Sequence, residues 1–507
     1  MKKLILRSRN FIKTHGIISF FFGVFYKLTG KPAFYSRELK NLNKRNAIIG
    51  NMLFENQQKE SAELNIQLEI NNFKHKPLIS VIMPLYNSPA KWFDAAIASL
   101  QAQTYTNWEL CAVDDGSKNK EAIEILKRMT TQDSRKRLHV MFKNSGISAA
   151  SNKALEMARG EYVALMDHDD ELTSDAFFWV VKEINDHPDS DFIYSDECKV
   201  DCIKGVKYDY VFKPDWSPTL LLSHMYTGHL TVYKTKTVKE AGGFRSKYDF
   251  SQDYDLALRM SAISKNVRHV ERILYLWRTV PGSAAGGDKD YARKSNMAAV
   301  RDWYNRNNIE AAITDDAGIN KATIYATDNS EDFIFISNDL SPVSKDWRKR
   351  MTEVLALPDV GAVTPLILTE NDTVHSAGII QNEIGTAKYA FHGMSYRSSK
   401  YLLLKPPHIM RDISVLSEDC FLIKKDVLHE IGIADIHDIS ENLTNIEISR
   451  RIAEKGYKIV YTPYAIFRKM HTPKEHALEK SPQEEANHSI KDPFFTDSMK
   501  MLYRVNS

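Results

Sequence analysis

Cysteine, long apolar runs and an excess of charge of one sign are all scarce in this sequence of 507 residues. The four cysteines, Cys111, Cys198, Cys202 and Cys420, are too few for a disulfide scaffold and indicate reduced thiols in a cytosolic protein. Cys198 and Cys202 lack a second pair at metal-ligand spacing, so no zinc site is expected. The net charge of +3 argues against a nucleic-acid partner.

No run reaches the ~20 apolar residues that a membrane-spanning helix needs, and the longest, residues 17–26 (IISFFFGVFY), has about half that length. The first 37 residues hold eight bases and no acid. Positive charge beside a short aromatic run favours a segment lying on an anionic membrane surface. A signal peptide and a docked core helix are the alternatives, although Lys27 and Lys31 interrupt any cleavage site. We therefore expect a cytoplasmic protein, peripheral at the inner face of the cytoplasmic membrane.

From Pro77 onward, apolar strand-like runs alternate with helical patterns. The strand-like runs are LISVIMP, WELCAVDD, RLHVMF and EYVALMD, and the helical ones include AKWFDAAIASLQAQ, KEAIEILKRM and SAASNKALEMA. This alternation indicates a mostly parallel sheet with helices on both faces. Ligands bind at the carboxyl ends of the strands in such sheets, so the loops after these strands are where chemistry is expected.

The loops after the four strands are rich in acids and turn residues. They contain, in order, Pro84, Tyr86 and Asn87; Asp114 and Asp115; Asn144 and Gly146; and Asp167, His168, Asp169 and Asp170. Each residue alone is more often a structural turn or a helix cap than a site. Together they line one edge of the sheet with carboxylates, which favours a divalent cation that bridges them to phosphate oxygens. No P-loop or GxGxxG sequence follows a strand, which excludes those two modes of nucleotide binding.

Two further acids, Asp253 and Asp255, follow Ser251 in the run SQDYDLALR. Ser251 is expected to cap a helix, and acids in a first helical turn are favoured by the helix dipole. Residues at i and i+2 do not share a helix face, so at most one of the two acids would face a substrate.

Seven runs occur in a fixed order over residues 77–285. They are PLISVIMPLYN, VDDGS, NSGISAASNKAL, GEYVALMDHDDEL, FKPDWSP, GGF and SQDYDLALR. Together they resemble the family 2 glycosyltransferases, which have the GT-A nucleotide-sugar fold. The resemblance implies a nucleotide-sugar site made of Pro84, Tyr86, Asn87, Asp114, Asp115, Asn144, Gly146, Asn152, Asp167, His168 and Asp169.

In the family that the sequence resembles, the chemistry is a single displacement with inversion. The segment from Asp167 to Asp169 matches the DXD motif, which implies that Asp169, with Asp167, binds Mn²⁺ or Mg²⁺ on the donor diphosphate. That cation would stabilise the charge that develops on the leaving group. Asp253 matches the catalytic base, which takes the proton of the attacking acceptor hydroxyl.

Two positions depart from the family pattern. Leu276 stands where the family often has a histidine. If that histidine binds metal in relatives, we expect His269 or water to replace it here, or the metal to be bound more weakly. Pro84 stands where some relatives place a threonine that contacts the base. Neither change removes the central acids, so activity is expected.

From residue 322 to residue 475 the chain again resembles the second half of this family. Asp339 and His471 fit its metal positions, whereas residues 445–447 (NIE) replace its acid-rich motif. We expect a basic and apolar N-terminal segment with a helical arm at 1–76, a GT-A domain at 77–318, and a truncated, inactive GT-A-like domain with a C-terminal tail at 319–507. The two matching residues of the last unit are expected to be vestigial.

The sequence thus predicts a glycosyltransferase that acts on a bacterial surface glycan, on an acceptor that is expected to be lipid-linked. A processive synthase is disfavoured because spanning helices and a QxxRW motif are absent. A sugar nucleotidyltransferase would carry a glycine-rich phosphate loop near its first strand. Residues 83–87 (MPLYN) do not form such a loop, so this alternative is disfavoured as well. A non-catalytic scaffold is the third alternative, and the retained acids at the strand ends argue against it.

Overall fold

The computed structural model describes residues 33–118, 123–124, 127–128, 133–280, 290–327, 329, 331–381, 387–399, 404, 406–433, 444–470 and 492–503. The basic N-terminal segment up to residue 32 and His471 lie outside these residues, so the expectations for them stay predictions. No helix in the described part of the chain is long and apolar enough to cross a membrane. All four cysteines are free thiols, as expected.

A nine-stranded sheet, sheet A, forms the first unit. Its strand order is β3-β2-β1-β4-β8-β6-β9-β5, with β7 beside β6. The strands are β1 (Ile79–Leu85), β2 (Trp108–Asp114), β3 (Lys136–Val140), β4 (Tyr162–Leu165), β5 (Glu171–Leu172), β6 (Phe192–Asp201), β7 (Lys207–Val211), β8 (Thr231–Lys234) and β9 (Val267–Thr279). Strands β3, β2, β1 and β4 are parallel, as are β6 and β9, and β8 runs antiparallel between the two groups.

Helices cover both faces of sheet A, as the alternating sequence pattern predicts. They are α4 (Ala90–Gln101), α6 (Ile147–Met157), α7 (Ala176–Asp186), α8 (Pro218–Ser223), α9 (Thr235–Glu240), α10 (Gln252–Ile263) and α11 (Asp290–Arg306). Successive residues of β1 face opposite sides: Val81 packs with Phe93 and Phe177, whereas Ile82 packs with Ala154 and Leu256. Burial on both faces explains why the central strands are almost wholly apolar.

A second sheet, sheet C, follows the hairpin of β10 (Ala311–Asp316) and β11 (Ile319–Ile324). Its strands are β12 (Phe333–Ile336), β13 (Leu340–Pro342), β14 (Val360–Leu368), β15 (Val374–Ser376), β18 (Arg411–Ile413), β19 (Cys420–Ile423) and β20 (Lys458–Lys469). It is accompanied by α12 (Trp347–Leu355), α13 (Tyr396–Ser399), α14 (Lys425–Glu430), α16 (Asn445–Glu454), α17 (Asp497–Tyr503) and the ribbon of β16 (Ile379–Gln381) and β17 (Ala387–Tyr389).

Sheet C repeats the strand pairing of one half of sheet A. In sheet A, β8 pairs antiparallel with β4 and β6, while β9 pairs parallel with β6 and antiparallel with β5. In sheet C, β19 pairs antiparallel with β12 and β14, while β20 pairs parallel with β14 and antiparallel with β13. Within the described residues, sheet C has no parallel strands that correspond to β1, β2 and β3. A second unit with further sheets is thereby confirmed, and its assignment as an incomplete GT-A-like unit stays a prediction.

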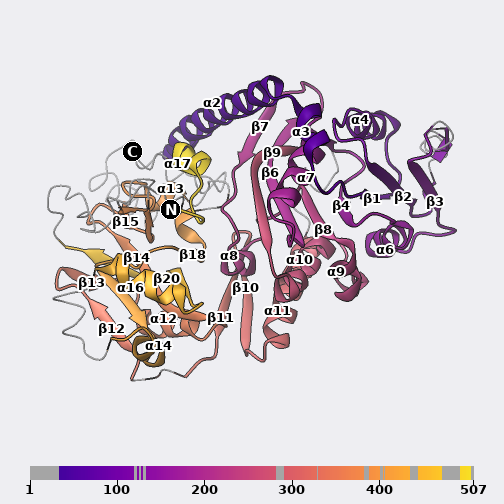
Figure 1. Cartoon of the computed structure of the whole chain (residues 1–507). Coiled ribbons are helices and arrows are strands. Elements are labelled where there is room, and N and C mark those ends of the chain that lie inside the picture. The colour runs from indigo at the N-terminus through magenta and orange to yellow at the C-terminus, as the bar shows by residue number, and fades with distance from the viewer. Residues whose placement is uncertain are drawn as a thin grey trace, which may run out of the picture.

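The helix α2 (Ala33–Glu63) lies across the top of the molecule in Figure 1, above both units. It contacts α13 and α17 of the second unit and β7 and β9 of the first. The Ser61 hydroxyl donates to Asp175 (2.6 Å), and Glu60 pairs with Arg272 (2.9 Å). Helix α2, followed by α3 (Ile66–Asn72), is therefore the expected helical arm, and it braces the two units.

A buried carboxylate, Asp412 of β18, fastens the second unit to the first. It accepts hydrogen bonds from the hydroxyl of Ser217 (2.6 Å) and from the main-chain N–H and hydroxyl of Thr219 (3.0 and 2.7 Å). Ser217 is the N-cap of α8, so Asp412 stabilises the start of this helix. Three donors would lose their partner if this side chain were removed.

We expect Asp412→Ala to lower the free energy of unfolding by about 2 to 3 kcal/mol, because it leaves buried donors unpaired at a helix start. Urea unfolding followed by circular dichroism measures the change. Asp94→Ala on the exposed face of α4 is the matched control and should change stability by less than about 0.5 kcal/mol. An equal effect of the two substitutions would contradict the anchoring role of Asp412.

Candidate active site

A cavity of about 410 Å³ lies at the carboxyl ends of β1 and β4. It brings together the predicted residues Pro84, Asp167 and Asp253, which come from β1, from the loop after β4 and from the first turn of α10. His229 before β8 also lines it, and so does Leu404 of the second unit. The cavity is thus where the acid-rich edge of the parallel strands meets the helix that carries Asp253.

The hydroxyl of Tyr275 in β9 organises the acidic loop after β4. It accepts a hydrogen bond from the main-chain N–H of Asp167 (3.1 Å) and donates one to Oδ2 of Asp170 (2.6 Å). The main-chain N–H of Arg278 donates to the other oxygen of Asp170 (2.7 Å). Both oxygens of this fully buried carboxylate are therefore engaged, and Asp170 holds the loop in place.

Burial and crowding of like charges disfavour ionisation in this loop. Burial, followed by the charges of Asp167 and Asp169, raises the pKa of Asp170 well above its usual range. Burial also raises the pKa of Asp167, and the charges of Asp169 and Asp253 act in the same direction while His229 opposes them. Because the Asp167 side chain is still 44% exposed, it remains open to a cation that would favour its charged form.

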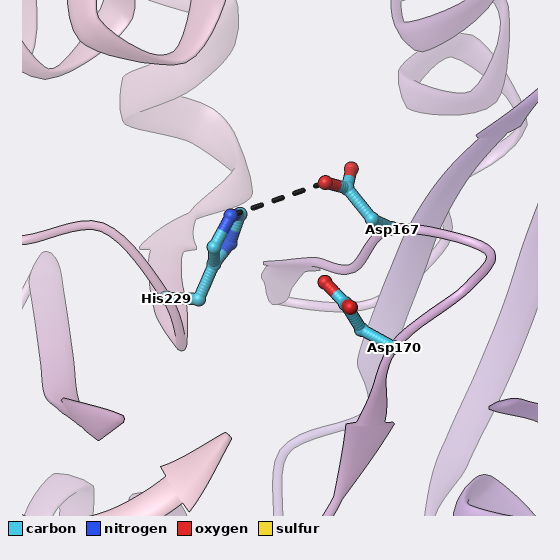
Figure 2. Close-up of side chains that lie close together, drawn as sticks. All are labelled: Asp167, Asp170 and His229. Atoms are coloured by element: carbon cyan, nitrogen blue, oxygen red, sulfur yellow. Dashed lines mark ion pairs between the residues drawn. The ribbon is translucent and has the colours of Figure 1, made fainter. Parts of the chain in front are cut away.

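His229 stands opposite Asp167, as Figure 2 shows. Its Nε2 lies 3.9 Å from Oδ2 of Asp167, and its ring stacks on Tyr275 with centroids 4.5 Å apart. Its buried Nδ1 has no hydrogen-bond partner within the described part of the chain. Sequence reasoning assigned no role to this residue, since the run Gly228-His229-Leu230 before an apolar strand is its only signal.

The backbone around His229 is held by a buried ion pair that the sequence did not suggest. The ammonium of Lys213 is fully buried and donates to Glu197 (3.0 Å) and to the carbonyl oxygens of Ser195, Thr227 and His229 (2.6, 2.7 and 2.6 Å). Glu197 also accepts from the main-chain N–H of His229 (2.8 Å). Burial opposes its ionisation, but the charges of Lys213 and His229 bring the pKa of Glu197 below its usual value.

Asp167, Asp170 and His229 form a group that fits a divalent metal. One ligand atom from each lies within 4.8 Å of the others. Carboxylate oxygens with an imidazole nitrogen suit Mn²⁺, and carboxylates alone suit Mg²⁺. Since Asp170 already accepts two hydrogen bonds, the more available ligands are Asp167 and His229, whose Nδ1 has no hydrogen-bond partner among the described residues.

The predicted ligand Asp169 lies next to this group but outside it. Its main-chain carbonyl accepts from the guanidinium of Arg278 (3.0 Å), and both Asp169 and His168 are half-buried. A metal-binding role for the Asp169 carboxylate therefore stays a prediction, as does a contact between His168 and a nucleotide sugar.

His269 does not replace the histidine that is missing at Leu276, contrary to one of the three expectations. It is buried near the start of β9, where its nitrogens bond to Asp196 (2.9 Å) and Asp215 (3.0 Å). Leu276 pairs with Glu171 at the edge of the sheet. His229, which lies just before β8, is instead the histidine that the fold places beside Asp167.

Two of the predicted nucleotide-binding acids are engaged with main-chain donors. Asp115 accepts from the N–H groups of Ser145 (2.7 Å) and Gly146 (2.9 Å), and Asp114 accepts from Ser117 (2.9 Å). These bonds shape the two loops at the edge of the sheet. A direct contact between either acid and a nucleotide stays a prediction.

The remaining predicted residues of these loops divide into engaged and open side chains. Asn152 bonds through both amide atoms to the main chain of Phe244 (2.7 and 2.8 Å), and the Asn87 amide oxygen accepts from Lys118 (2.9 Å). Asn144 is exposed, and Tyr86 is 45% exposed. The open ring of Tyr86 is therefore the side chain best placed to stack on a planar ligand.

Asp253 and Asp255 lie in opposite environments on α10. Asp255 is buried and pairs with Arg245 and with Arg259 (2.8 Å). Asp253 lines the cavity, and its Oδ1 accepts from the main-chain N–H of Tyr254 (2.8 Å). The i, i+2 spacing thus turns one acid into the core and the other towards the cavity.

Asp339 of the second unit has an internal cation beside it. Its carboxylate accepts from the hydroxyl of Ser337 (2.6 Å) and lies 3.6 Å from the ammonium of Lys469. The same ammonium pairs with Asp419 (2.6 Å), which also bonds to His375 (3.1 Å). A lysine between these two carboxylates supplies the positive charge that a metal would bring, which favours a structural role for Asp339.

Comparison with known proteins identifies the family. The model of glycosyl transferase family 2 matches residues 80–246. The chain is 31% identical over 208 residues to an uncharacterized glycosyltransferase of Methanocaldococcus jannaschii, across 40% of this chain and 71% of that protein. The chain belongs to glycosyl transferase family 2. The predicted family and fold class are thereby confirmed.

Two further similarities are more distant. The O-antigen biosynthesis protein RfbC of Myxococcus xanthus is 23% identical over 482 residues, across 78% of this chain and 37% of RfbC. A crystal structure of S. aureus TarS 1–349 in complex with UDP-GlcNAc matches 44% of this chain and 66% of that one, with 20% identity and a TM-score of 0.38, which is too low to support a functional inference. The chain spans about half the length or less of the first curated relatives that it matches, 53% and 37%.

The buried pair of His269 and Asp196 generates a prediction on pH dependence. Burial opposes the charge on His269, but Asp196 and Asp215 raise its pKa to about 9. Because the unfolded value is ~6.5, the stabilisation is fully present below about pH 6.5 and is lost as the pH rises through about 9. The double variant His269→Gln/Asp196→Asn keeps a hydrogen bond without a titrating pair. Between pH 6.5 and 9.5 the free energy of unfolding of the natural chain should fall by on the order of 3 kcal/mol. The double variant should not show this fall.

Urea unfolding at several pH values measures this decline. His75→Gln is the control, because the ion pair of this exposed histidine with Glu161 lies at the surface and contributes little to stability. Parallel pH profiles for the natural chain and the double variant would refute the assignment.

Proposed function

We propose that the protein is an inverting glycosyltransferase that moves a sugar from a nucleotide-sugar donor to a growing, lipid-linked bacterial surface glycan. The observation that carries the proposal is the cavity shared by Asp167, His229 and Asp253, which come from three separate elements. The similarity to an O-antigen biosynthesis protein supports the glycan acceptor. The basic N-terminal segment supports a peripheral position at the inner face of the cytoplasmic membrane.

On the donor side, Asp167, His229 and the predicted ligand Asp169 would hold Mn²⁺ or Mg²⁺, which supplies positive charge to the departing diphosphate. Tyr275 fixes this loop, because its hydroxyl bonds both to the main-chain N–H of Asp167 and to the buried carboxylate of Asp170. Such preorganisation favours a charge that develops only in the transition state.

On the acceptor side, Asp253 takes the proton of the attacking hydroxyl. Its Oδ1 is fixed by the N–H of Tyr254 (2.8 Å), which leaves Oδ2 for the acceptor. Attack from the side of Asp253 while the diphosphate leaves towards Asp167 inverts the anomeric centre in one step.

We expect Asp253→Asn to lower turnover by ~10²- to 10⁴-fold while the affinity for the donor nucleotide is kept, because only proton transfer is lost. Calorimetric titration of UDP, dTDP and GDP, with and without Mn²⁺, identifies the nucleotide that binds. Release of that nucleoside diphosphate from its sugar donors then measures turnover.

Asp94→Asn on the exposed face of α4 is the matched control and should keep full turnover. Undiminished turnover in Asp253→Asn would reject the proposed base. Absence of binding by all three nucleotides would favour the alternative of a non-catalytic scaffold.

A further inference from the structure

Two exposed aromatic side chains stand beside the proposed base. Phe250 is 59% exposed and lines the same cavity as Asp253. Tyr291, at the start of α11, is 45% exposed, and its ring meets that of Phe250 edge to face with centroids 4.5 Å apart. The next residue, Ala292, also lines the cavity. Exposed aromatic rings grouped at the edge of a cavity mark a binding surface.

The backbone at Phe250 is held in a conformation that a bulky side chain rarely adopts, with φ at 70°. Hydrogen bonds on either side fix it. Asp249 accepts from the main-chain N–H of Ser148 (3.2 Å), and the N–H and hydroxyl of Ser251 donate to the carbonyls of Tyr248 (2.9 Å) and Ala292 (3.0 Å). Strain that its surroundings maintain in this way is found at ligand sites.

The lining next to the aromatic pair is polar. Gln252 and Asp253 follow Phe250 in the chain and line the same cavity. The side-chain oxygen of Gln252 has no hydrogen-bond partner among the described residues. A surface with aromatic rings on one side and an amide and a carboxylate on the other is suited to a ligand that has both an apolar face and hydroxyl groups.

A pyranose ring has this combination. Its C–H groups form an apolar face that packs on aromatic rings, and its hydroxyls around the edge reach amides and carboxylates. An alkyl chain would offer no hydrogen bond to the amide oxygen of Gln252 or to Oδ2 of Asp253, at a cost in desolvation. The chemistry of the surface therefore favours a sugar over a lipid tail.

We propose that Phe250 and Tyr291 form a stacking platform that holds a pyranose ring of the acceptor glycan beside Asp253. This inference rests on the proposed function, which makes Asp253 the base for the acceptor hydroxyl. The edge-to-face contact fixes the two rings relative to each other, and the strained backbone of Phe250 keeps its ring at the cavity instead of in the core.

Saturation-transfer NMR with a panel of octyl hexopyranosides tests the platform on the full chain. We expect signals from the sugar C–H protons of at least one glycoside. These signals should fall about tenfold in Phe250→Ala and in Tyr291→Ala and be recovered in Phe250→Trp. Tyr325→Ala removes a tyrosine that is 60% exposed and is the matched control with unchanged signals.

Each other outcome overturns the platform. Signals from the octyl protons alone would identify an apolar surface for lipid, and signals that survive both alanine substitutions would place the sugar elsewhere. No signal in the natural chain would exclude a pyranose site.

Calorimetry with UDP, dTDP and GDP on the same variants separates this proposal from the transferase itself. Bound nucleotide with sugar signals that are independent of Phe250 rejects the platform alone. Sugar signals that depend on Phe250 without any bound nucleotide support the platform and reject the transferase.

Discussion

The site depends on one hydroxyl, that of Tyr275. This hydroxyl forms hydrogen bonds with the main-chain N–H of Asp167 and with the buried carboxylate of Asp170. The ring of Tyr275 stacks on the imidazole of His229. The loop after β4 and the segment before β8 are thereby held face to face around the acidic group. The buried ion pair of Lys213 and Glu197 bonds to the main chain of His229 and so also holds the segment before β8. Burying the two charges costs desolvation free energy, which is offset because both groups are hydrogen-bonded.

The two halves of sheet A contribute different residues to the site. The parallel strands β1, β2 and β3 carry the loops expected to meet a nucleotide, whereas the mixed strands β8, β6 and β9 supply His229, Glu197 and Tyr275. In the part of the chain that the structure describes, sheet C repeats the mixed half alone, and Lys469 lies between Asp339 and Asp419. Helix α2 and Asp412 hold the second unit against the first, and the loss of donor binding in the second unit stays a prediction.

The sequence predicts what depends on local pattern and misses what depends on distant partners. The alternation of strand-like and helical runs predicted the parallel half of the sheet. The i, i+2 spacing predicted that Asp253 and Asp255 would not share a helix face. The engagement of Asp115 and Asn152 with main-chain groups could not be predicted, because their partners come from other loops. His229 was missed for the same reason, since only the antiparallel insertion of β8 brings it to Asp167.

The most direct test of the account is the anomeric configuration of the sugar that the protein releases. Proton NMR can follow slow hydrolysis of the nucleotide sugar whose nucleotide binds, with water as the acceptor in place of a glycan. The account predicts that the first sugar to appear has the configuration opposite to that in the donor, because Asp253 and the acidic loop act on opposite sides of the anomeric carbon. Release with retained configuration would contradict a single displacement and the role given to Asp253.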